Sequence, residues 1–222
     1  MSKTFYIFFL LILSGNLIAL DDPKVAIMRH GEGEHNLLHI YSTWTKEEGG
    51  IDHSLTEAGK QQVTATAQKL LSQGFNKETV GLVLVSPLQR TRETAQILID
   101  NGVCSENMLM IEDLIREPRA ENWEGKPSPP KLLNDTRSDE VRWQATIDAS
   151  ALHGGETTES IRLRIEEIIH RLSQWDASRG HVILISHGYT AQVFLKTYGE
   201  EKVTLNTAEA RILSFPNLKQ EN

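Results

Sequence analysis

Residues 24–31 have the sequence Lys-Val-Ala-Ile-Met-Arg-His-Gly. A short apolar run between polar residues is typical of a buried β-strand. This run ends directly in a cation and an imidazole, Arg29 and His30. In α/β sheets, ligands bind beyond the carboxyl ends of the strands. The stretch therefore predicts a buried strand that delivers Arg29 and His30 to a binding site.

The rest of the chain alternates between strand and helix patterns. Apolar runs predict further strands over Val80 to Val85, Met108 to Ile111, Val182 to Ile185 and Ala210 to Phe215. Apolar residues at helical spacing or helix-start signals predict helices over Thr56 to Leu71, Ser86 to about Ile99, Thr157 to Trp175 and Tyr189 to Tyr198. Such alternation implies a mostly parallel sheet with helices on both faces.

Two segments lack a periodic pattern. Residues 31–54 are polar and contain several glycines, which predicts a long loop. Residues 117–155 include Pro127, Pro129 and Pro130, which break any long helix there. We expect this second segment to be a small cap or loop insertion in one domain, not a domain of its own.

The composition limits the classes of partner. Hydrophobic residues make up 39% of the 222 residues and charged residues 24%, as expected for a globular domain. The formal net charge of −7 gives no general attraction to nucleic acid or to an anionic membrane surface, so we expect neither partner. The single cysteine, Cys104, permits no intramolecular disulfide and no cysteine metal cluster. The sequence indicates no oligomeric state.

The first twenty residues differ from the remainder. Lys3 precedes the apolar run Phe5 to Leu13, and small Ala19 precedes acidic Asp21. This order is typical of a secretory signal peptide, with a signal anchor as the alternative. We expect residues 1–20 to be removed and residues 21–222 to form the exported domain, in a periplasm, a secretory pathway or the exterior. The chain would stay membrane-anchored if Phe5 to Leu13 is retained.

Two further polar sets follow apolar strands. Ser86 and Arg90 follow the second strand, and Ser186-His187-Gly188 follows the fourth. Together with Arg29 and His30, they would place two arginines and two histidines at one edge of the sheet. The planar guanidinium fork suits phosphoryl oxygens, and a neutral imidazole nitrogen can attack phosphorus.

These segments resemble the histidine phosphatase superfamily in its phosphoglycerate mutase-like branch. The resemblance covers about residues 24–215 and rests on six motifs in the family's order. They are Arg29-His30-Gly31-Glu32 with Asn36, Leu55-Thr56-Glu57-Ala58-Gly59, Ser86 to Ala95 (S-P-L-Q-R-T-R-E-T-A), Leu114 to Glu117 with Trp123-Glu124-Gly125, Gly154-Gly155-Glu156-Thr157, and Ser186-His187-Gly188. The expected fold is a three-layer αβα sandwich with a mostly parallel sheet, an antiparallel edge strand and a small cap at about residues 117–155.

The resemblance implies a role for each matching residue. His30 would form a phosphohistidine, and Glu117 would protonate the leaving oxygen and then activate water. The phosphoryl oxygens would be held by Arg29, Arg90, His187 and Asn36. Glu112, Asp113 and Glu121 are nearby alternatives to Glu117. No metal or other cofactor is required, because the cations are side chains.

The function implied is hydrolysis of small phosphomonoesters, and three alternatives stay open. They are phosphoryl transfer of the phosphoglycerate mutase type, a protein phosphohistidine phosphatase, and a non-catalytic binding protein on this fold. The sequence departs from the family motif at Gly33, which is followed by Glu34 and His35. This change alters the wall beside the pocket. It therefore leaves the identity of the substrate undetermined, but it does not affect the expected chemistry.

Overall fold

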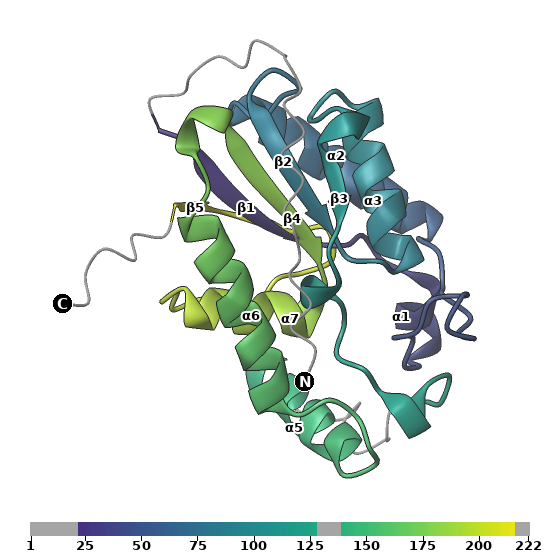
Figure 1. The fold of residues 1–222 in the computed structure, drawn as a ribbon. Coiled ribbons are helices and arrows are strands. Elements are labelled where there is room, and N and C mark those ends of the chain that lie inside the picture. Colours follow the sequence, from purple (N-terminus) through teal and green to yellow (C-terminus); the bar gives the residue numbers. More distant parts are fainter. Residues whose placement is uncertain (1–21, 128–138, 216–222) are drawn as a thin grey trace, which may run out of the picture.

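The computed structural model describes residues 22–127 and 139–215, and these form a three-layer αβα sandwich (Figure 1). The five strands are β1 (Lys24–Arg29), β2 (Val80–Val85), β3 (Leu109–Ile111), β4 (His181–Ser186) and β5 (Ala210–Ser214). They pair in the order β3-β2-β4-β1-β5, and only β5 runs antiparallel to its neighbour. The predicted fold class is confirmed.

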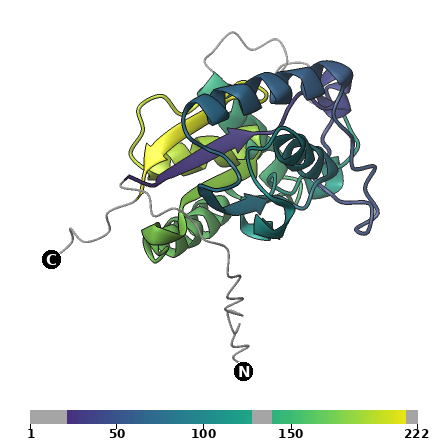
Figure 2. The ribbon, with the colours of Figure 1, turned by 90° about the horizontal axis from the view of Figure 1, so that it is seen from above.

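Six α-helices are present in the described residues. They are α1 (Glu34–Leu38), α2 (Glu57–Ser72), α3 (Gln89–Asp100), α5 (Asp139–Ala151), α6 (Thr158–Ser173) and α7 (Gly188–Thr197). Short 3-10 helices cover Glu106–Met108, Asp113–Ile115, Glu121–Trp123 and Ala177–Arg179. The view from above shows helices on both sides of the sheet (Figure 2).

Side-chain alternation along the strands builds two cores. Val25 and Ile27 of β1 face the cluster that contains α6 and α7, whereas Ala26 and Met28 face the cluster that contains α2 and α3. All four side chains are essentially buried. Because successive strand residues point to opposite faces, an uninterrupted apolar run is what a strand covered on both faces requires.

Helix starts follow their capping residues. The hydroxyl of Thr56 accepts a hydrogen bond from the Gly59 amide (2.9 Å) at the start of α2, and Thr157 caps α6 in the same way through Ser160 (3.2 Å). Both helices therefore begin one residue after the threonine. Helix α3 begins at Gln89, later than the predicted Ser86.

Two expected irregular segments contain helices. The prediction that residues 117–155 are irregular is wrong over α5, because the prolines lie before residue 139 and residues 139–151 contain neither proline nor glycine. Helix α1 lies inside the expected loop 31–54. Helix α5 packs against α6 and beside Glu121–Trp123 below the sheet, where it forms the predicted cap (Figure 1).

The N-terminal segment lies outside the described residues, so the signal peptide over residues 1–20 stays a prediction. Within residues 22–127 and 139–215, no helix has the length and apolar character needed to cross a membrane.

Candidate active site

The site lies where β1, β2 and β4 end. The amide of His30 donates to the carbonyl of Ser186 (3.0 Å), and the amide of Ser86 donates to that of Ile185 (3.1 Å). These bonds continue the parallel register past the last strand residues, so the polar residues after each strand meet at one edge. The sequence prediction that they converge is confirmed.

Two glycines let the loop after His30 lie against helix α2. A Cβ on Gly31 would come within 2.5 Å of the carbonyl oxygen of Gly59, and a Cβ on Gly59 would come within 2.1 Å of that of Glu32. Neither position tolerates a side chain without a shift of backbone. Gly31 and Gly59, which belong to two separate motifs, therefore both permit one close contact between backbones. This contact fixes His30 relative to α2.

The His30 ring is held in one tautomer. Its Nδ1 lies 2.6 Å from the carbonyl oxygen of Gly31, so Nδ1 carries the proton and donates it. Its Nε2 then carries the lone pair and accepts a hydrogen bond from Nε of Arg90 (3.1 Å). Burial, and next the positive charges of Arg90 and Arg29, hold the pKa of His30 well below its usual value. The imidazole is therefore neutral at physiological pH, with Nε2 as the nucleophilic atom.

Arg90 of α3 contacts both His30 and His187. Besides its bond to His30, its Nη2 lies 3.1 Å from Nδ1 of His187. The side chain is 1% exposed, and its Nη1 has no hydrogen-bond partner among the described residues. Burial lowers the Arg90 pKa to about 10, which still leaves the guanidinium charged at neutral pH. A buried cation with an unused donor beside a nucleophile is suited to bind an anion there.

His187 is the N-cap residue of α7 and is completely buried. Its Nε2 lies 2.7 Å from the hydroxyl oxygen of Ser86. Burial, followed by the charge of Arg90, holds its pKa well below the usual value. A neutral ring that accepts from Arg90 at Nδ1 carries its proton on Nε2 and donates it to Ser86. The sequence placed Ser86 at the site but gave it no role; the structure shows that it orients His187.

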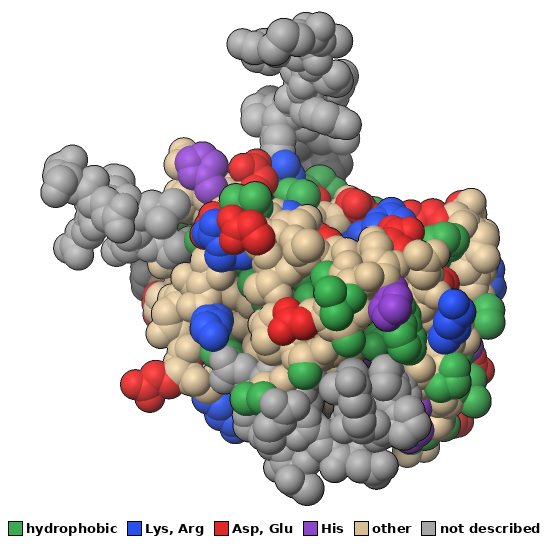
Figure 3. Space-filling model, turned by 90° about the horizontal axis from the view of Figure 1, so that it is seen from below, with side chains coloured by type: hydrophobic (Ala, Val, Ile, Leu, Met, Phe, Trp, Pro, Cys, Tyr) green, Lys and Arg blue, Asp and Glu red, His purple; other side chains and the backbone are tan. Residues whose placement is uncertain are grey.

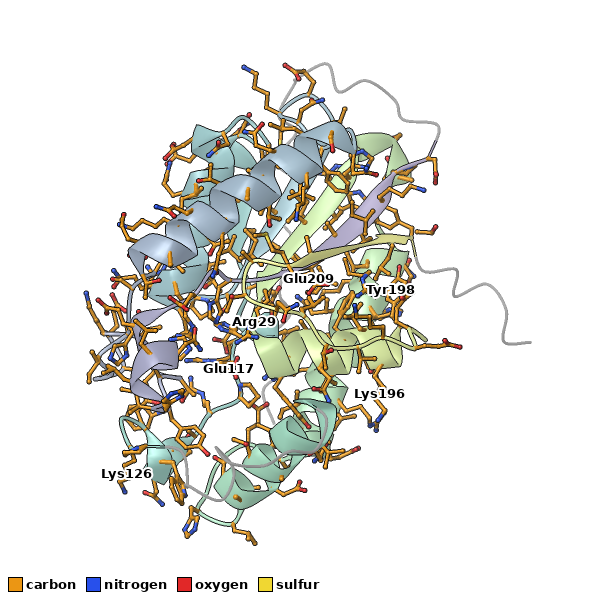
Figure 4. The ribbon with its side chains drawn as sticks, turned by 180° about the vertical axis from the view of Figure 1, so that it is seen from behind. Arg29, Glu117, Lys126, Lys196, Tyr198 and Glu209 are labelled. Carbon is orange, nitrogen blue, oxygen red and sulfur yellow. The ribbon has the colours of Figure 1, made fainter. Side chains whose placement is uncertain are left out.

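Arg29 completes the cationic floor. Its Nη1 donates to the carbonyl of Leu205 (3.0 Å), and the charge of Glu117 partly offsets the lowering of its pKa by burial. Figure 4 shows Arg29 and Glu117 next to one another below the sheet. Helix α7 begins at Gly188, which lines the same cavity, so its amino end adds a favourable potential for an anion.

Glu117 is carried by a segment that is bound at three consecutive carbonyls. The carbonyl of Leu114 accepts from Nη1 of Arg164, that of Ile115 accepts from the hydroxyl of Ser186 (2.7 Å), and that of Arg116 accepts from Nη2 of Arg164 (3.0 Å). The hydroxyl of Thr190 also donates to the Arg116 carbonyl (2.7 Å). Donors from β4, α6 and α7 thus hold the backbone that leads to Glu117.

Arg164 is itself fixed by a largely buried ion pair. Its Nε lies 2.7 Å from Oε1 of Glu156, and the two side chains are 11% and 14% exposed. Nothing in the sequence pattern indicated that Arg164 contacts the Glu117 segment. Only the packing of α6 against Asp113–Ile115 shows this contact.

Glu117 sits where an acid could act on a bound phosphoryl group. Its Oε2 lies 3.4 Å from Nδ1 of His187. Burial raises its pKa, and the charges of Arg90, Arg29 and Arg164 oppose that rise. The alternatives lie elsewhere: Glu112 pairs with Arg171 (3.1 Å) and Asp113 with Arg116 (3.0 Å), and neither lines the cavity. Glu121 does not line it either.

Asn36 and His35 form part of the wall beside His30. The Oδ1 of Asn36 accepts from the Gly33 amide (2.9 Å), and its Nδ2 lies 3.0 Å from Nε2 of His35. Asn36 lines the cavity, but its amide already serves the turn and the neighbouring ring, so its contact with phosphate stays a prediction. The His35 ring centroid lies 5.4 Å from that of His30. Its place next to the nucleophile was the only signal in the sequence.

The cavity at this edge has a volume of about 370 Å³. Its floor is formed by Arg29, His30 and Arg90. Among the described residues, its walls are formed by His35, Asn36, residues 39–43, Glu117, Pro118, Ala120, three residues of α5 and the start of α7. Within the described ranges, no three His, Cys, Asp or Glu side chains gather in a way that could hold a metal ion.

Comparison with known proteins agrees with this geometry. Residues 25–210 match the histidine phosphatase superfamily (branch 1). The glucosyl-3-phosphoglycerate phosphatase of Mycolicibacterium vanbaalenii is 27% identical over 172 residues, which are 74% of this chain and 69% of that protein. A probable phosphoglycerate mutase of Photorhabdus laumondii is 24% identical over 169 residues, with 74% and 69% covered.

A solved structure shows the same fold. The mycobacterial glucosyl-3-phosphoglycerate phosphatase in complex with VO3 superposes with a TM-score of 0.63 at 19% identity, over 86% of this chain and 92% of that one. The likeness shows that the two chains share a fold.

Proposed function

The chain belongs to the histidine phosphatase superfamily as a phosphoric monoester hydrolase, and on that premise we propose that it hydrolyses phosphomonoesters without a metal, through a phosphohistidine at His30. The observation that carries this proposal is the contact between His30 Nε2 and the buried guanidinium of Arg90. It places an aligned nucleophile and an unused cationic donor in one desolvated pocket.

The first half-reaction forms a nitrogen–phosphorus bond. His30 Nε2 attacks phosphorus, the bond from phosphorus to the leaving oxygen breaks, and Glu117 gives its proton to that oxygen. Arg90, Arg29 and the amino end of α7 stabilise the negative charge on the phosphoryl oxygens. The raised pKa of Glu117 favours the protonated form that this step needs.

The second half-reaction releases phosphate. Glu117, now a carboxylate, takes a proton from a water molecule whose oxygen attacks phosphorus, and the bond to Nε2 breaks. The hydrogen bond from His30 Nδ1 to the Gly31 carbonyl keeps the ring in place through both steps. A single carboxyl group thus serves first as acid and then as base.

The proposal is tested by hydrolysis of para-nitrophenyl phosphate, with and without a chelator. We expect His30→Ala to lower kcat by at least about 10⁴-fold, because the substitution removes the attacking nitrogen. His170→Ala, which removes an exposed histidine of α6, is the matched control. Rapid quenching with a labelled substrate should trap an acid-labile phosphoenzyme in the parent only. Full activity in His30→Ala would contradict the proposal, and so would loss of the parent's activity in the presence of chelator.

Phosphoglycerate mutase activity is the second candidate, since a relative carries that name. The two activities differ in the acceptor of the phosphoryl group, which is water for a phosphatase and a second hydroxyl for a mutase. With 3-phosphoglycerate and 2,3-bisphosphoglycerate supplied together, we expect free phosphate and no 2-phosphoglycerate. Isomer formation faster than phosphate release would favour the mutase.

A further inference from the structure

Residues 52–56, here named the bridging segment, pair with the loop that follows the nucleophile. Gly33 and Leu55 form an isolated antiparallel bridge. Beside this bridge, the amide of Glu34 donates to the carbonyl of Ser54 (3.0 Å). Backbone hydrogen bonds of this kind fix the position of one strand-like segment against the other. The bridging segment is therefore held at a set position relative to the nucleophile loop.

The bridging segment also binds the start of α3, the helix that carries the catalytic guanidinium. The Oδ1 of Asp52 accepts from the amide of Gln89 (2.8 Å), and the side-chain Nε2 of Gln89 donates to the hydroxyl of Ser54 (2.7 Å). One turn further along α3, Oε2 of Glu93 accepts from the amide of Leu55 (2.7 Å). The same five residues thus connect the nucleophile loop to α3.

Asp52 provides the cap that α3 lacks locally. Leu88 occupies the N-cap position, and its side chain makes no capping hydrogen bond. The first amides of a helix have no partner within the helix, so a nearby acceptor stabilises them, and a negative charge there also interacts favourably with the helix dipole. Asp52 supplies both from 37 positions earlier in the chain. Its bond to Gln89 fixes the turn of α3 that contains Arg90.

The backbone at Asp52 adopts a conformation that few residues accept. Its φ angle is 53°, in the left-handed region, which aspartate and asparagine tolerate better than other residues with a side chain. Residues in this region persist where the surrounding structure holds them, and they cluster at functional sites. Position 52 therefore requires tolerance of this backbone conformation as well as a side-chain acceptor.

The Asp52 carboxylate is buried beside cations. Figure 3 shows Asp and Glu side chains at the surface of the lower face, whereas Asp52 is 3% exposed. Burial of a charge costs free energy unless protein groups compensate for the lost water. Besides the Gln89 amide, Nη2 of Arg92 lies 3.9 Å from Oδ2. Burial lowers the pKa of Arg90, and the charges of Glu117 and then of Asp52 oppose that fall.

We propose that Asp52 is a positioning residue for Arg90, which it orients toward His30 by capping α3 from the bridging segment. Asp52 does not line the cavity, so it acts through Arg90 and not on the substrate. This inference rests on the proposed function and goes beyond it by giving a role to a residue outside the site. A purely structural role would instead lower stability and leave the activity of each folded molecule unchanged.

Two substitutions at position 52 separate the backbone, the acceptor and the charge. Asp52→Gly accepts a positive φ but removes the acceptor, whereas Asp52→Asn keeps an acceptor of the same shape and removes the charge. With para-nitrophenyl phosphate, and with rates divided by the folded fraction from denaturant melts, we expect kcat/KM to fall at least about tenfold in Asp52→Gly. We expect a smaller loss, about threefold, in Asp52→Asn.

Asp176→Gly is the matched control. Asp176 also caps a helical turn, Ala177–Arg179, where its Oδ1 accepts from the amide of Ser178 (3.0 Å). This turn precedes β4, so it lies at the end of the sheet opposite to the site. We expect kcat/KM of the folded control to match that of the parent.

A double-mutant cycle shows whether Asp52 acts through Arg90. In an Arg90→Lys background, the planar fork that Asp52 positions is already lost. We therefore expect neither substitution at position 52 to lower kcat/KM further by more than about 1.5-fold. If Asp52→Gly does not fold, the cycle with Asp52→Asn decides the question, because its loss of about threefold should disappear in the same way.

The outcomes distinguish this inference from the proposed function. Equal losses in the parent and Arg90→Lys backgrounds overturn the role of Asp52, and so does full activity per folded molecule in both variants at position 52. A loss in Asp176→Gly as large as that in Asp52→Gly overturns it too. Each of these results leaves the proposed function standing if hydrolysis by the parent depends on His30. Hydrolysis that survives His30→Ala overturns the proposed function itself.

Discussion

At the floor of the cavity, His30 and His187 follow buried parallel strands, and Arg90 is the second residue of α3, a helix packed on the same sheet. Each of the three side chains is at most 2% exposed. At the wall, the residues come from the segment 39–43, from the stretch after Glu117 and from α5, and their side chains range from buried, as at Thr43 and Ile147, to exposed, as at His39. The floor is oriented by backbone register, whereas the wall is held by side chains that bind loop carbonyls. The comparison teaches that chemistry and substrate choice depend on different kinds of interaction and can be changed separately.

The largest change should come from the floor. Arg90→Lys keeps the charge but loses the planar fork that contacts both histidines. We expect kcat/KM to fall by about 10³–10⁴-fold for every substrate, since loss of one such donor alone costs about 10²–10³. Arg92→Lys on the same helix, where the side chain is 47% exposed, is the control. A loss that varied strongly with the leaving group would contradict the role given to Arg90.

Glu117 links the floor to the wall, so its variant should depend on the substrate. Glu117→Gln should lower kcat/KM by about 10²–10³-fold for alkyl phosphates, and much less for para-nitrophenyl phosphate, whose leaving group needs no proton. Glu121→Gln should have little effect, because that side chain lies outside the cavity. If both substrate types lost activity equally, Glu117 would not be the acid.

The pH dependence of the same variant provides a second readout. The acid form of Glu117 is needed, so the rate with alkyl phosphates should fall as pH rises through its raised pKa. Neutral His30 is needed as well, and its lowered pKa keeps the rate from falling until well below pH 6.5. In Glu117→Gln, the fall in rate at high pH should disappear from the pH–rate profile. Any change in rate that comes from ionisation of the substrate should persist in both the parent and the variant. If the fall in rate at high pH were unchanged in the variant, a group other than Glu117 would be its cause.

Arg164 should produce a smaller change with the same substrate pattern. Arg164→Lys loses the fork that binds the carbonyls of Leu114 and Arg116 while keeping a cation for Glu156. We expect kcat/KM for alkyl phosphates to fall by roughly tenfold, and hydrolysis of para-nitrophenyl phosphate to change little, because only the acid is displaced. Arg162→Lys, on the exposed side of α6, is the control. An equal loss for both substrates would show a general structural defect.

The smallest effect concerns stability of the wall. Glu48 accepts from Nη1 and Nη2 of Arg116 (3.1 and 2.8 Å) and from Arg119 (2.5 Å), and the hydrogen bond from Arg116 holds the Glu48 pKa far below its usual value. We expect Glu48→Gln to cost about 1–2 kcal/mol of unfolding free energy at pH 7. Because the folded pKa is lowered, this difference should be complete above about pH 5 and shrink as pH falls below the unfolded value of about 4.3. Denaturant melts at pH 7 and pH 4 measure this difference. Glu106→Gln, at an exposed residue, is the control. A difference that grew in acid would contradict the assignment.

The sequence predicted the floor better than the wall. Arg29, His30, Arg90 and His187 were found because each follows a recognisable strand or sits at fixed spacing from its end. In the wall, α5 was missed because three prolines lie just before it, and the contact of Arg164 with the Glu117 segment joins residues about fifty positions apart. Neither periodicity nor spacing reports such a contact.

The sequence alone determined the strand–helix order, the edge of the sheet that carries the site and the residues of its floor. A buried parallel strand needs a continuous apolar run, and the residues that follow such strands lie at one edge of the sheet. The tertiary structure decided the tautomers of the two histidines and the position of Glu117. Each of these depends on hydrogen bonds and burial between segments distant in sequence, and only the packed chain brings those segments together.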